Sequence, residues 1–198
     1  MDAESERSRV EDIQMTIAAR RLPVLLLLAL SVCFSAFGQS SSSSTDLPNL
    51  FKVSTNLYRG GQPTEAGIKQ LAEMGIKTVI NLRDDDGRER TEQIWVRAAG
   101  LNFINIALSN IFGPKDAKID EILKQIDLAD NQPVFVHCKR GSDRTGTVIP
   151  VYRITHDGWT GDQATIEAKK FGLGWWQFWM KDYIEDYYRD HNSAGPKK

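Results

Sequence analysis

A ten-residue segment in the second half of the chain combines residue types that can do chemistry. It runs from His137 to Gly146 and holds Cys138 and, six residues later, Arg144. The apolar run 134–136 before it predicts a buried strand, then a loop and the start of a helix. Successive backbone N–H groups of such a loop and the free N–H groups of the next helix form an anion nest. The segment is therefore predicted to bind a tetrahedral anion beside a cysteine.

The side chains of this segment suit nucleophilic attack on phosphorus. The helix N-terminus favours the thiolate of Cys138, which is the nucleophilic form. The planar guanidinium of Arg144 can hold two oxygens of a phosphate group, and Thr145 can donate its hydroxyl to the sulfur. Gly141 permits a turn that a side chain would hinder. These residues predict in-line attack and a covalent phosphocysteine. The alternative, a strand-to-helix turn with an inert buried cysteine, explains fewer of them.

The hydrophobic pattern around this segment alternates between strands and helices. Strands are expected at 51–58, 78–82, 103–106 and 134–136; helices are expected around 68–75, over 89–99, around 119–126, and from the loop after residue 141 through 188. Such alternation predicts an α/β fold with a central, mainly parallel sheet flanked by helices. In these folds ligands bind beyond the carboxyl ends of the strands, where the loop after residue 136 begins.

The N-terminus has the order of regions found in secretory signals. Arg20 and Arg21 precede the apolar run 22–37, and Ala36 and Gly38 stand at the small-residue positions of a cleavage site. We predict a signal peptide over 1–38, a serine-rich linker over 39–46, a phosphatase-like domain over 47–198, and export to the periplasm or the exterior. An uncleaved membrane anchor is the alternative.

Charge and cysteine content restrict the classes of function. The chain carries 25 Lys and Arg against 26 Asp and Glu, so no global excess of positive charge points to nucleic acid. Cys33 falls within the predicted signal, which leaves Cys138 without a disulfide partner in the mature chain. No spacing typical of metal ligands is present, and no cofactor is expected.

The loop sequence His-Cys-x-x-Gly-x-x-Arg-Thr-Gly resembles the signature of the protein tyrosine and dual-specificity phosphatases. The run 57–63 (Leu-Tyr-Arg-Gly-Gly-Gln-Pro) and the strand 78–83 are similar to those of the small atypical dual-specificity phosphatases of plants, fungi and bacteria. The resemblance spans about Phe51 to Ile154. It implies the phosphatase fold, metal-free hydrolysis, Cys138 as nucleophile and Arg144 as phosphate clamp.

The general acid is the point where the chain departs from this family. At the usual distance before the catalytic strand the chain has Ser109 and Asn110 rather than aspartate. Asp116 serves if its loop folds inward, and Asp143 lies next to Arg144 in the sequence. A carboxylic acid must reach the leaving oxygen. Asp116 and Asp143 are equal candidates for this role.

The remaining residues of the loop are predicted to bind substrate. Lys139 and Arg140 add positive charge that suits a substrate with several phosphates, although two solvated side chains explain them equally well. The substrate-binding set is completed by Gly141, Ser142 and Thr145, and His137 is expected to orient the loop. The substrate is a phosphorylated protein, lipid or inositol phosphate, and membrane contact is not indicated.

Three further interpretations depend on residues outside the loop. The run Asp84–Asp86 is read as a solvated acidic loop, and Arg83 and Arg88 as residues that flank the pocket. The cluster Trp175, Trp176, Phe178 and Trp179 is read as core packing, with contact to a membrane or a partner as the alternative.

Two other functions compete with an active phosphatase. A catalytically weak phosphate-binding module would explain the missing acid, although Cys138 and Arg144 are both intact. A sulfur-transfer or arsenate-reducing enzyme also uses a cysteine within an anion loop, but these enzymes lack the Arg-Thr-Gly continuation or need further cysteines.

Overall fold

A computed structural model describes residues 45–84 and 87–192 of the chain. The predicted signal peptide and residues 39–44 of the predicted linker lie outside the described residues. All the described residues belong to one compact unit. Its buried hydrophobic side chains all fall between Leu47 and Tyr187, so a chain that begins at residue 39 keeps the whole described core.

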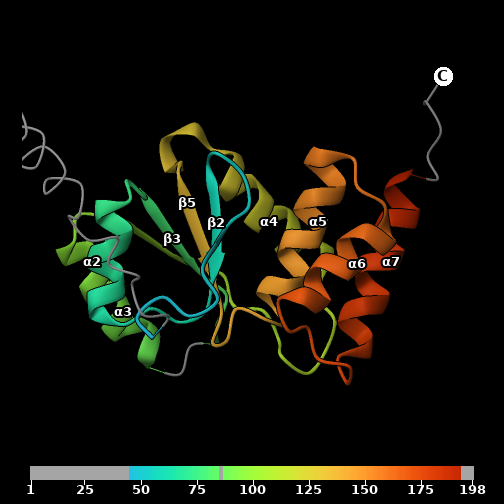
Figure 1. Cartoon of the computed structure of the whole chain (residues 1–198), viewed down its shortest axis with the longest axis horizontal. Helices are drawn as coiled ribbons and strands as arrows, with labels where there is room; N and C mark the ends of the chain where they lie inside the picture. The colour runs from blue at the N-terminus through green and yellow to red at the C-terminus, as the bar shows by residue number, and fades with distance from the viewer. Residues whose placement is uncertain (1–44, 85–86, 193–198) are drawn as a thin grey trace, which may run out of the picture. The chain divides into compact units, whose positions relative to one another are not determined.

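Five strands form one mixed sheet at the centre of this unit (Figure 1). The strands are β1 (Phe51–Lys52), β2 (Leu57–Gly60), β3 (Thr78–Asn81), β4 (Asn102–Asn105) and β5 (Val134–His137), in the order β1-β2-β5-β3-β4. Only β1 runs antiparallel to its neighbour, and every other pairing is parallel. The predicted α/β class with a mainly parallel sheet is confirmed.

Helices cover both faces of the sheet (Figure 1). They are α2 (Glu65–Glu73), α3 (Arg88–Ala98), α4 (Asp116–Asp127), α5 (Thr145–Asp157), α6 (Gly161–Lys170) and α7 (Phe178–Asn192), with a 3-10 turn η1 (Ala129–Asn131) before β5. Helices α2 and α3 pack on one face, and the apolar side chains of α4 to α7 form a larger cluster on the other.

The alternation of side chains along β5 divides the core between these two faces. Phe135 packs with the α2–α3 cluster, whereas Val134, Val136 and Cys138 belong to the cluster of α4 to α7. Successive side chains of a strand point to opposite faces, so the same alternation sends His137 toward α3 and Cys138 toward α5.

Helix caps explain where several helices begin and end. The Thr64 side chain accepts a hydrogen bond from Gly67 N and begins α2, and Thr160 and Gln163 form a capping box at the start of α6. Gly158, with φ +67°, ends α5 in the left-handed conformation.

Two sequence interpretations are wrong in detail. The run 51–58 is two short strands rather than one, because Ser54, Thr55 and Asn56 form a turn in which Val53 N donates to Leu57 O. Asp46, placed in the linker, belongs to the folded unit, since its carboxylate accepts a hydrogen bond from the Thr64 hydroxyl at 2.5 Å.

The aromatic cluster near the end of the chain is also not core. Trp175 is 73% exposed and Trp176 is 43% exposed, while Leu173 and Met180 on either side of them are buried. All four aromatic side chains of the cluster are therefore exposed, and the buried positions beside them hold other residue types. Among the described residues, none of the helices combines the length and apolarity needed to cross a membrane.

Candidate active site

The loop between β5 and α5 lies beyond the carboxyl end of the parallel strands, as predicted. It borders a cavity of about 230 Å³ lined by Asn110, Cys138, Lys139, Arg140, Asp143 and Arg144. Cys138 is 3% exposed and Arg144 is 7% exposed, so both are largely shielded from water. The structure thus brings together the predicted nucleophile and the predicted phosphate clamp around one cavity.

The path of this loop depends on a close backbone approach to the end of β2. Gly141 has φ +73°, and a Cβ atom at this position would lie 2.5 Å from both C and O of Gly60. The Gly61 N–H donates to Pro48 O, and Gln62 N–H donates to Lys139 O at 3.1 Å. Only glycine satisfies both the left-handed backbone and the space available at residue 141.

Arg59 is the buried cation that anchors the loop from beneath. Its side chain is fully buried, its Nη2 donates to Gly141 O at 2.6 Å, and its guanidinium stacks 4.1 Å from the Phe171 ring centroid. Burial lowers the pKa of Arg59 to about 10, and the negative charges of Glu167 and Cys138 act in the opposite direction. Arg59 is thus cationic at neutral pH and contributes positive potential to the nucleophile's surroundings.

The amide of Asn49 connects the same loop to the end of α6. Its Nδ2 donates to Gly141 O at 3.3 Å and to Phe171 O at 3.0 Å. The sequence analysis assigned no site role to Asn49, because asparagine at a turn is a common residue. Arg59 was named only as part of a family motif, although a buried arginine in a strand always requires acceptors.

His137 is held by a polar network from the α2–α3 side of the sheet. Its Nε2 lies 2.7 Å from Glu92 Oε1, and the other Glu92 oxygen accepts from Asn81 Nδ2 at 2.7 Å. The ring nitrogen Nδ1 lies 3.2 Å from Cys138 O. All three side chains are buried, so the network restrains the backbone at the nucleophile. The predicted orienting role of His137 is consistent with this geometry.

Arg144 contacts an acidic residue that the sequence analysis read as solvated. Its Nη1 donates to Asp84 Oδ2 at 3.3 Å. The Asp84 side chain is 66% exposed. A phosphate that enters the cavity can therefore compete with a weak, water-screened partner for this guanidinium. Asp85 and Asp86 lie outside the described residues.

Asp143 lines the cavity, but both of its carboxylate oxygens already accept hydrogen bonds. Oδ2 accepts from Arg140 Nη2 at 2.6 Å, and Oδ1 accepts from Gly174 N at 3.2 Å. The carboxylate is 4% exposed. In this arrangement Asp143 braces the loop against the segment before α7.

Asp116 is not brought to the cavity. It begins α4, is exposed, and accepts a hydrogen bond from the Tyr183 hydroxyl of α7 at 2.8 Å. Burial, followed by this hydrogen bond, raises the pKa of Tyr183, so the phenol keeps its proton and acts as the donor. Asp116 therefore ties two helices together at a distance from the catalytic loop.

The other predicted residues differ in their access to the cavity. Lys139 and Arg140 are exposed and line it. Ser142 is buried against Gly172, and the buried Thr145 hydroxyl has no hydrogen-bond partner among the described residues. Asn110 lines the cavity although no role was assigned to it. It follows β4, and the ends of parallel strands meet at one edge of the sheet.

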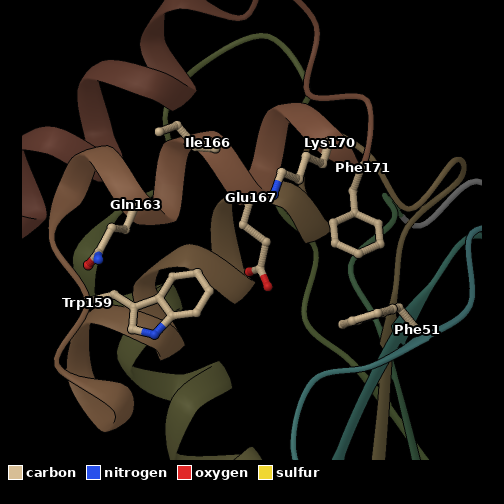
Figure 2. A pocket seen from close by; sticks show the side chains of 7 residues that line it. All are labelled: Phe51, Trp159, Gln163, Ile166, Glu167, Lys170 and Phe171. Atoms are coloured by element: carbon tan, nitrogen blue, oxygen red, sulfur yellow. The ribbon is translucent and has the colours of Figure 1, made fainter.

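Among the cavities lined by described residues, two lie outside the catalytic loop. The larger, about 430 Å³, is shown in Figure 2, where Phe51 and Phe171 face one another and Glu167 and Trp159 project beside them. Glu167 is held by Arg153 at 3.0 Å. A third cavity includes Arg83 and Arg88 in its lining, so these arginines do not flank the cavity at Cys138.

Within residues 45–84 and 87–192 there is no group of three or more His, Cys, Asp or Glu side chains that could hold a metal ion.

The sheet, the catalytic loop and the buried cysteine together define the cysteine-based phosphatase class of α/β protein. The family model described as "DSP-PTPase phosphatase fused to NAD+ Kinase" matches residues 32–172. The chain belongs to this family.

Curated relatives carry the same class of name. The dual specificity protein phosphatase TpbA of Pseudomonas aeruginosa is 31% identical over 127 residues, which cover 64% of this chain and 56% of TpbA. The inositol diphosphatase DSP5 of Arabidopsis thaliana is 27% identical over 149 residues, which cover 71% of this chain and 70% of that protein. The chain thus spans little more than half the length of TpbA.

Solved structures share the fold. TpbA in complex with pTyr superposes with a TM-score of 0.59 at 26% identity, covering 74% of this chain and 91% of that one. The PP-IP phosphatase SIW14 from S. cerevisiae, solved with citrate, gives a TM-score of 0.64 at 22% identity and covers 73% and 88% of the two chains. The predicted resemblance to atypical dual-specificity phosphatases is confirmed.

The contact between Gly141 and Gly60 predicts a large penalty for a single methyl group. Gly141→Ala should lower the free energy of unfolding by about 3 kcal/mol or more, since backbone atoms must move as well as adopt a strained conformation. Gly100→Ala is the matched control: Gly100 has φ +77° with nothing within 4 Å of an added Cβ. Gly100→Ala should lower the free energy of unfolding by about 1–2 kcal/mol, because it adds only the strain of a left-handed backbone. Equal losses in urea unfolding would contradict the close approach.

Proposed function

We propose that this chain is a cysteine-dependent phosphatase that hydrolyses a phosphate monoester through a phosphocysteine intermediate. The observation that carries the proposal is the cavity in which buried Cys138 and Arg144 meet within one loop at the carboxyl edge of the sheet. Family membership supports the same chemistry.

In the first step the Cys138 thiolate attacks phosphorus in line with the ester bond. A bond forms between sulfur and phosphorus, the bond between phosphorus and the leaving oxygen breaks, and that oxygen takes a proton from a general acid. Arg144 and the loop N–H groups bind the three non-bridging oxygens and stabilise their charge in the transition state. Lys139, beside the cavity, adds a positive charge.

In the second step water attacks the phosphocysteine. The bond between sulfur and phosphorus breaks, the thiolate is restored, and inorganic phosphate leaves. The residue that gave its proton in the first step takes one from the attacking water. We assign this residue as Asp143, because it is the one predicted aspartate that lines the cavity.

Two substrate classes have support. TpbA was solved with pTyr, and DSP5 is named an inositol diphosphatase. Lys139 and Arg140 at the cavity suit the additional phosphates of an inositol phosphate. The ion pair with Asp143 uses part of the charge of Arg140, which reduces this preference. A phosphotyrosine protein therefore stays an equal candidate.

A specific observation favours a second function, the catalytically weak phosphate-binding module. Both oxygens of Asp143 accept hydrogen bonds, and Asp116 lies away from the cavity. A carboxylate that accepts two hydrogen bonds is not placed to donate a proton. In this second function the chain binds phosphate groups and turns them over slowly unless substrate displaces Arg140.

Phosphate release by residues 39–198 under reducing conditions tests the nucleophile. The substrates are an aryl phosphate, phosphotyrosine and phosphoserine peptides, phosphoinositides and inositol polyphosphates. Release should fall by about four orders of magnitude or more in Cys138→Ser, because the hydroxyl is not ionised at neutral pH. Release that survives this substitution would contradict the mechanism. Binding of inorganic phosphate without any release would favour the binding module.

Replacement of each aspartate tests the general acid. Asp143→Asn should lower kcat by about 10²- to 10⁴-fold for an alkyl phosphate, whose leaving oxygen needs a proton. The loss should be smaller for a nitrophenyl phosphate, whose leaving group departs without one. Asp116→Asn is the control and should leave both rates within about twofold, since Asp116 lies outside the cavity. Equal losses for both substrates in Asp143→Asn would assign it a structural role only.

We further propose that residues 1–38 direct export and are removed, and that the phosphatase domain begins at Asp46, which contacts Thr64, rather than at residue 47. The support is the order of Arg20 and Arg21, the apolar run 22–37 and the small residues Ala36 and Gly38. The mass of the exported protein should match a chain that begins at Gln39. A full-length mass in the membrane fraction would instead identify residues 22–37 as an anchor.

A further inference from the structure

Large apolar side chains on the described surface gather beside the catalytic cavity, on the loop before α4 and on the segment that leads into α7. Of the eleven exposed large hydrophobic residues, six come from that loop, from the loop before α7 and from the first turn of α7, which makes the concentration local rather than general. We call this set the aromatic platform. Its members are Ile111 (65% exposed), Phe112 (71%), Trp175 (73%), Trp176 (43%), Phe178 (56%) and Trp179 (38%).

Ring and backbone contacts place the members of the platform next to one another. The Trp175 ring lies 5.9 Å from Trp176 and 6.4 Å from Phe178, both edge to face. The loop that carries Ile111 and Phe112 meets the start of α7 at Gly113, where an added Cβ would lie 3.3 Å from Trp179 O. The two segments thus form one surface.

This surface borders the catalytic cavity. Asn110, which lines the cavity, directly precedes Ile111 in the chain, and Arg140, another lining residue, has its guanidinium 6.0 Å from the Trp176 ring centroid. Whatever covers the platform therefore also faces the opening beside Cys138.

Cations stand next to the aromatic rings and the cavity. Lys139 and Arg140 are exposed at the cavity, and Lys181 Nζ lies 5.9 Å from the Phe178 ring and donates to Trp175 O at 3.1 Å. Of the nearby acids, Asp143 is buried with Arg140.

Two further acids lie on the helices that adjoin the platform. Asp116 is bound to Tyr183, and Asp182 is exposed on α7 next to Lys181. These carboxylates, with the exposed Asp84 beside Arg144, balance the cations in number. The cations lie nearest the rings, because Arg140 is 6.0 Å from the Trp176 ring and Lys181 is 5.9 Å from the Phe178 ring.

We propose that the aromatic platform docks on an anionic lipid bilayer and so presents the catalytic cavity to phosphate groups at the membrane surface. Tryptophan is favoured at membrane interfaces, where its apolar ring is buried and its N–H stays hydrated. Lysine and arginine near that surface are attracted to anionic headgroups.

A lipid surface fits this composition better than a protein partner does. The centres of protein interfaces are depleted in lysine, whereas lysine mixed with exposed tryptophan and phenylalanine is typical of segments that lie in a membrane interface. The inference that the substrate is a phosphate group at the level of the lipid headgroups rests on the proposed phosphatase function. The docking itself does not depend on that function.

Vesicle binding by residues 39–198 carrying Cys138→Ser tests the docking without turnover. The vesicles contain phosphatidylcholine with about one fifth phosphatidylglycerol, and a second set contains phosphatidylcholine only. The protein should sediment with the anionic vesicles, and its tryptophan emission should shift to shorter wavelength. Binding should weaken about fivefold or more without the anionic lipid and fall as salt rises, because exposed charges are screened.

A matched pair of substitutions tests the platform itself. Ile111 and Ile94 are similarly exposed, 65% and 67%, but Ile94 lies on α3, which packs on the other face of the sheet. Ile111→Ser and Trp175→Ala should each weaken vesicle binding by about fivefold to tenfold, since each removes an apolar side chain that the bilayer would bury. Ile94→Ser should leave it unchanged. Urea unfolding of each variant shows whether the fold is retained.

Three outcomes would overturn the proposal. The first is that the folded protein does not bind anionic vesicles. The second is an equal loss of binding in Ile94→Ser and Ile111→Ser. The third is a raised KM for a phosphoprotein in Trp175→Ala without vesicle binding, which would assign the platform to a protein partner. Hydrolysis of a soluble aryl phosphate by the chain with Cys138 intact, measured in parallel, shows whether the proposed phosphatase function survives independently.

Discussion

The backbone of the catalytic loop packs directly against the end of β2, and the site depends on this contact. Gly141 approaches Gly60 so closely that no Cβ fits, and the carbonyl of Gly141 accepts hydrogen bonds from Arg59 and Asn49. A loop that binds an anion through its N–H groups must point its carbonyls elsewhere. Here the buried guanidinium of Arg59 donates a hydrogen bond to the Gly141 carbonyl. The same contact therefore fixes the loop and places a positive charge near the nucleophile.

A second set of contacts reaches the loop from the opposite face of the sheet. Alternation along β5 sends His137 to the α3 side, where Glu92 and Asn81 hold it. Cys138 then lies on the side of α5. His137, the last residue of β5, therefore positions the loop, and the next residue, Cys138, faces the cavity. Restraint from both faces limits the freedom of the nucleophile before any substrate binds.

The side chains at the opening of the cavity differ in exposure from those at its base. Beneath the loop the side chains of Arg59, His137 and Thr145 are buried, whereas Asp84, Lys139 and Arg140 at the opening are exposed. The neighbouring loops add exposed aromatic rings. Rigid strands hold the chemistry, and the surface loops around it are free to vary with the substrate.

The α/β class, the parallel strands and the catalytic loop were evident from the sequence, because periodicity and the spacing of Cys138 and Arg144 are local properties of the chain. Tertiary structure decided the roles of residues far apart in sequence. It placed Asp116 away from the cavity and Asp84 next to Arg144. It also gave both carboxylate oxygens of Asp143 hydrogen-bond donors, Arg140 and Gly174.

Composition gave a wrong prediction for the aromatic run near residue 175, because such a run is compatible with both a buried and an exposed position. The aromatic run near residue 175 reads as core because tryptophan and phenylalanine bury large areas, yet burial depends on what packs above each ring. Sequence by itself determined the reactive group and the loop that surrounds it, since both lie within one short segment. Only the tertiary structure decided which charges, carbonyls and aromatic side chains meet that segment, because those contacts join residues that are neighbours only in the folded chain.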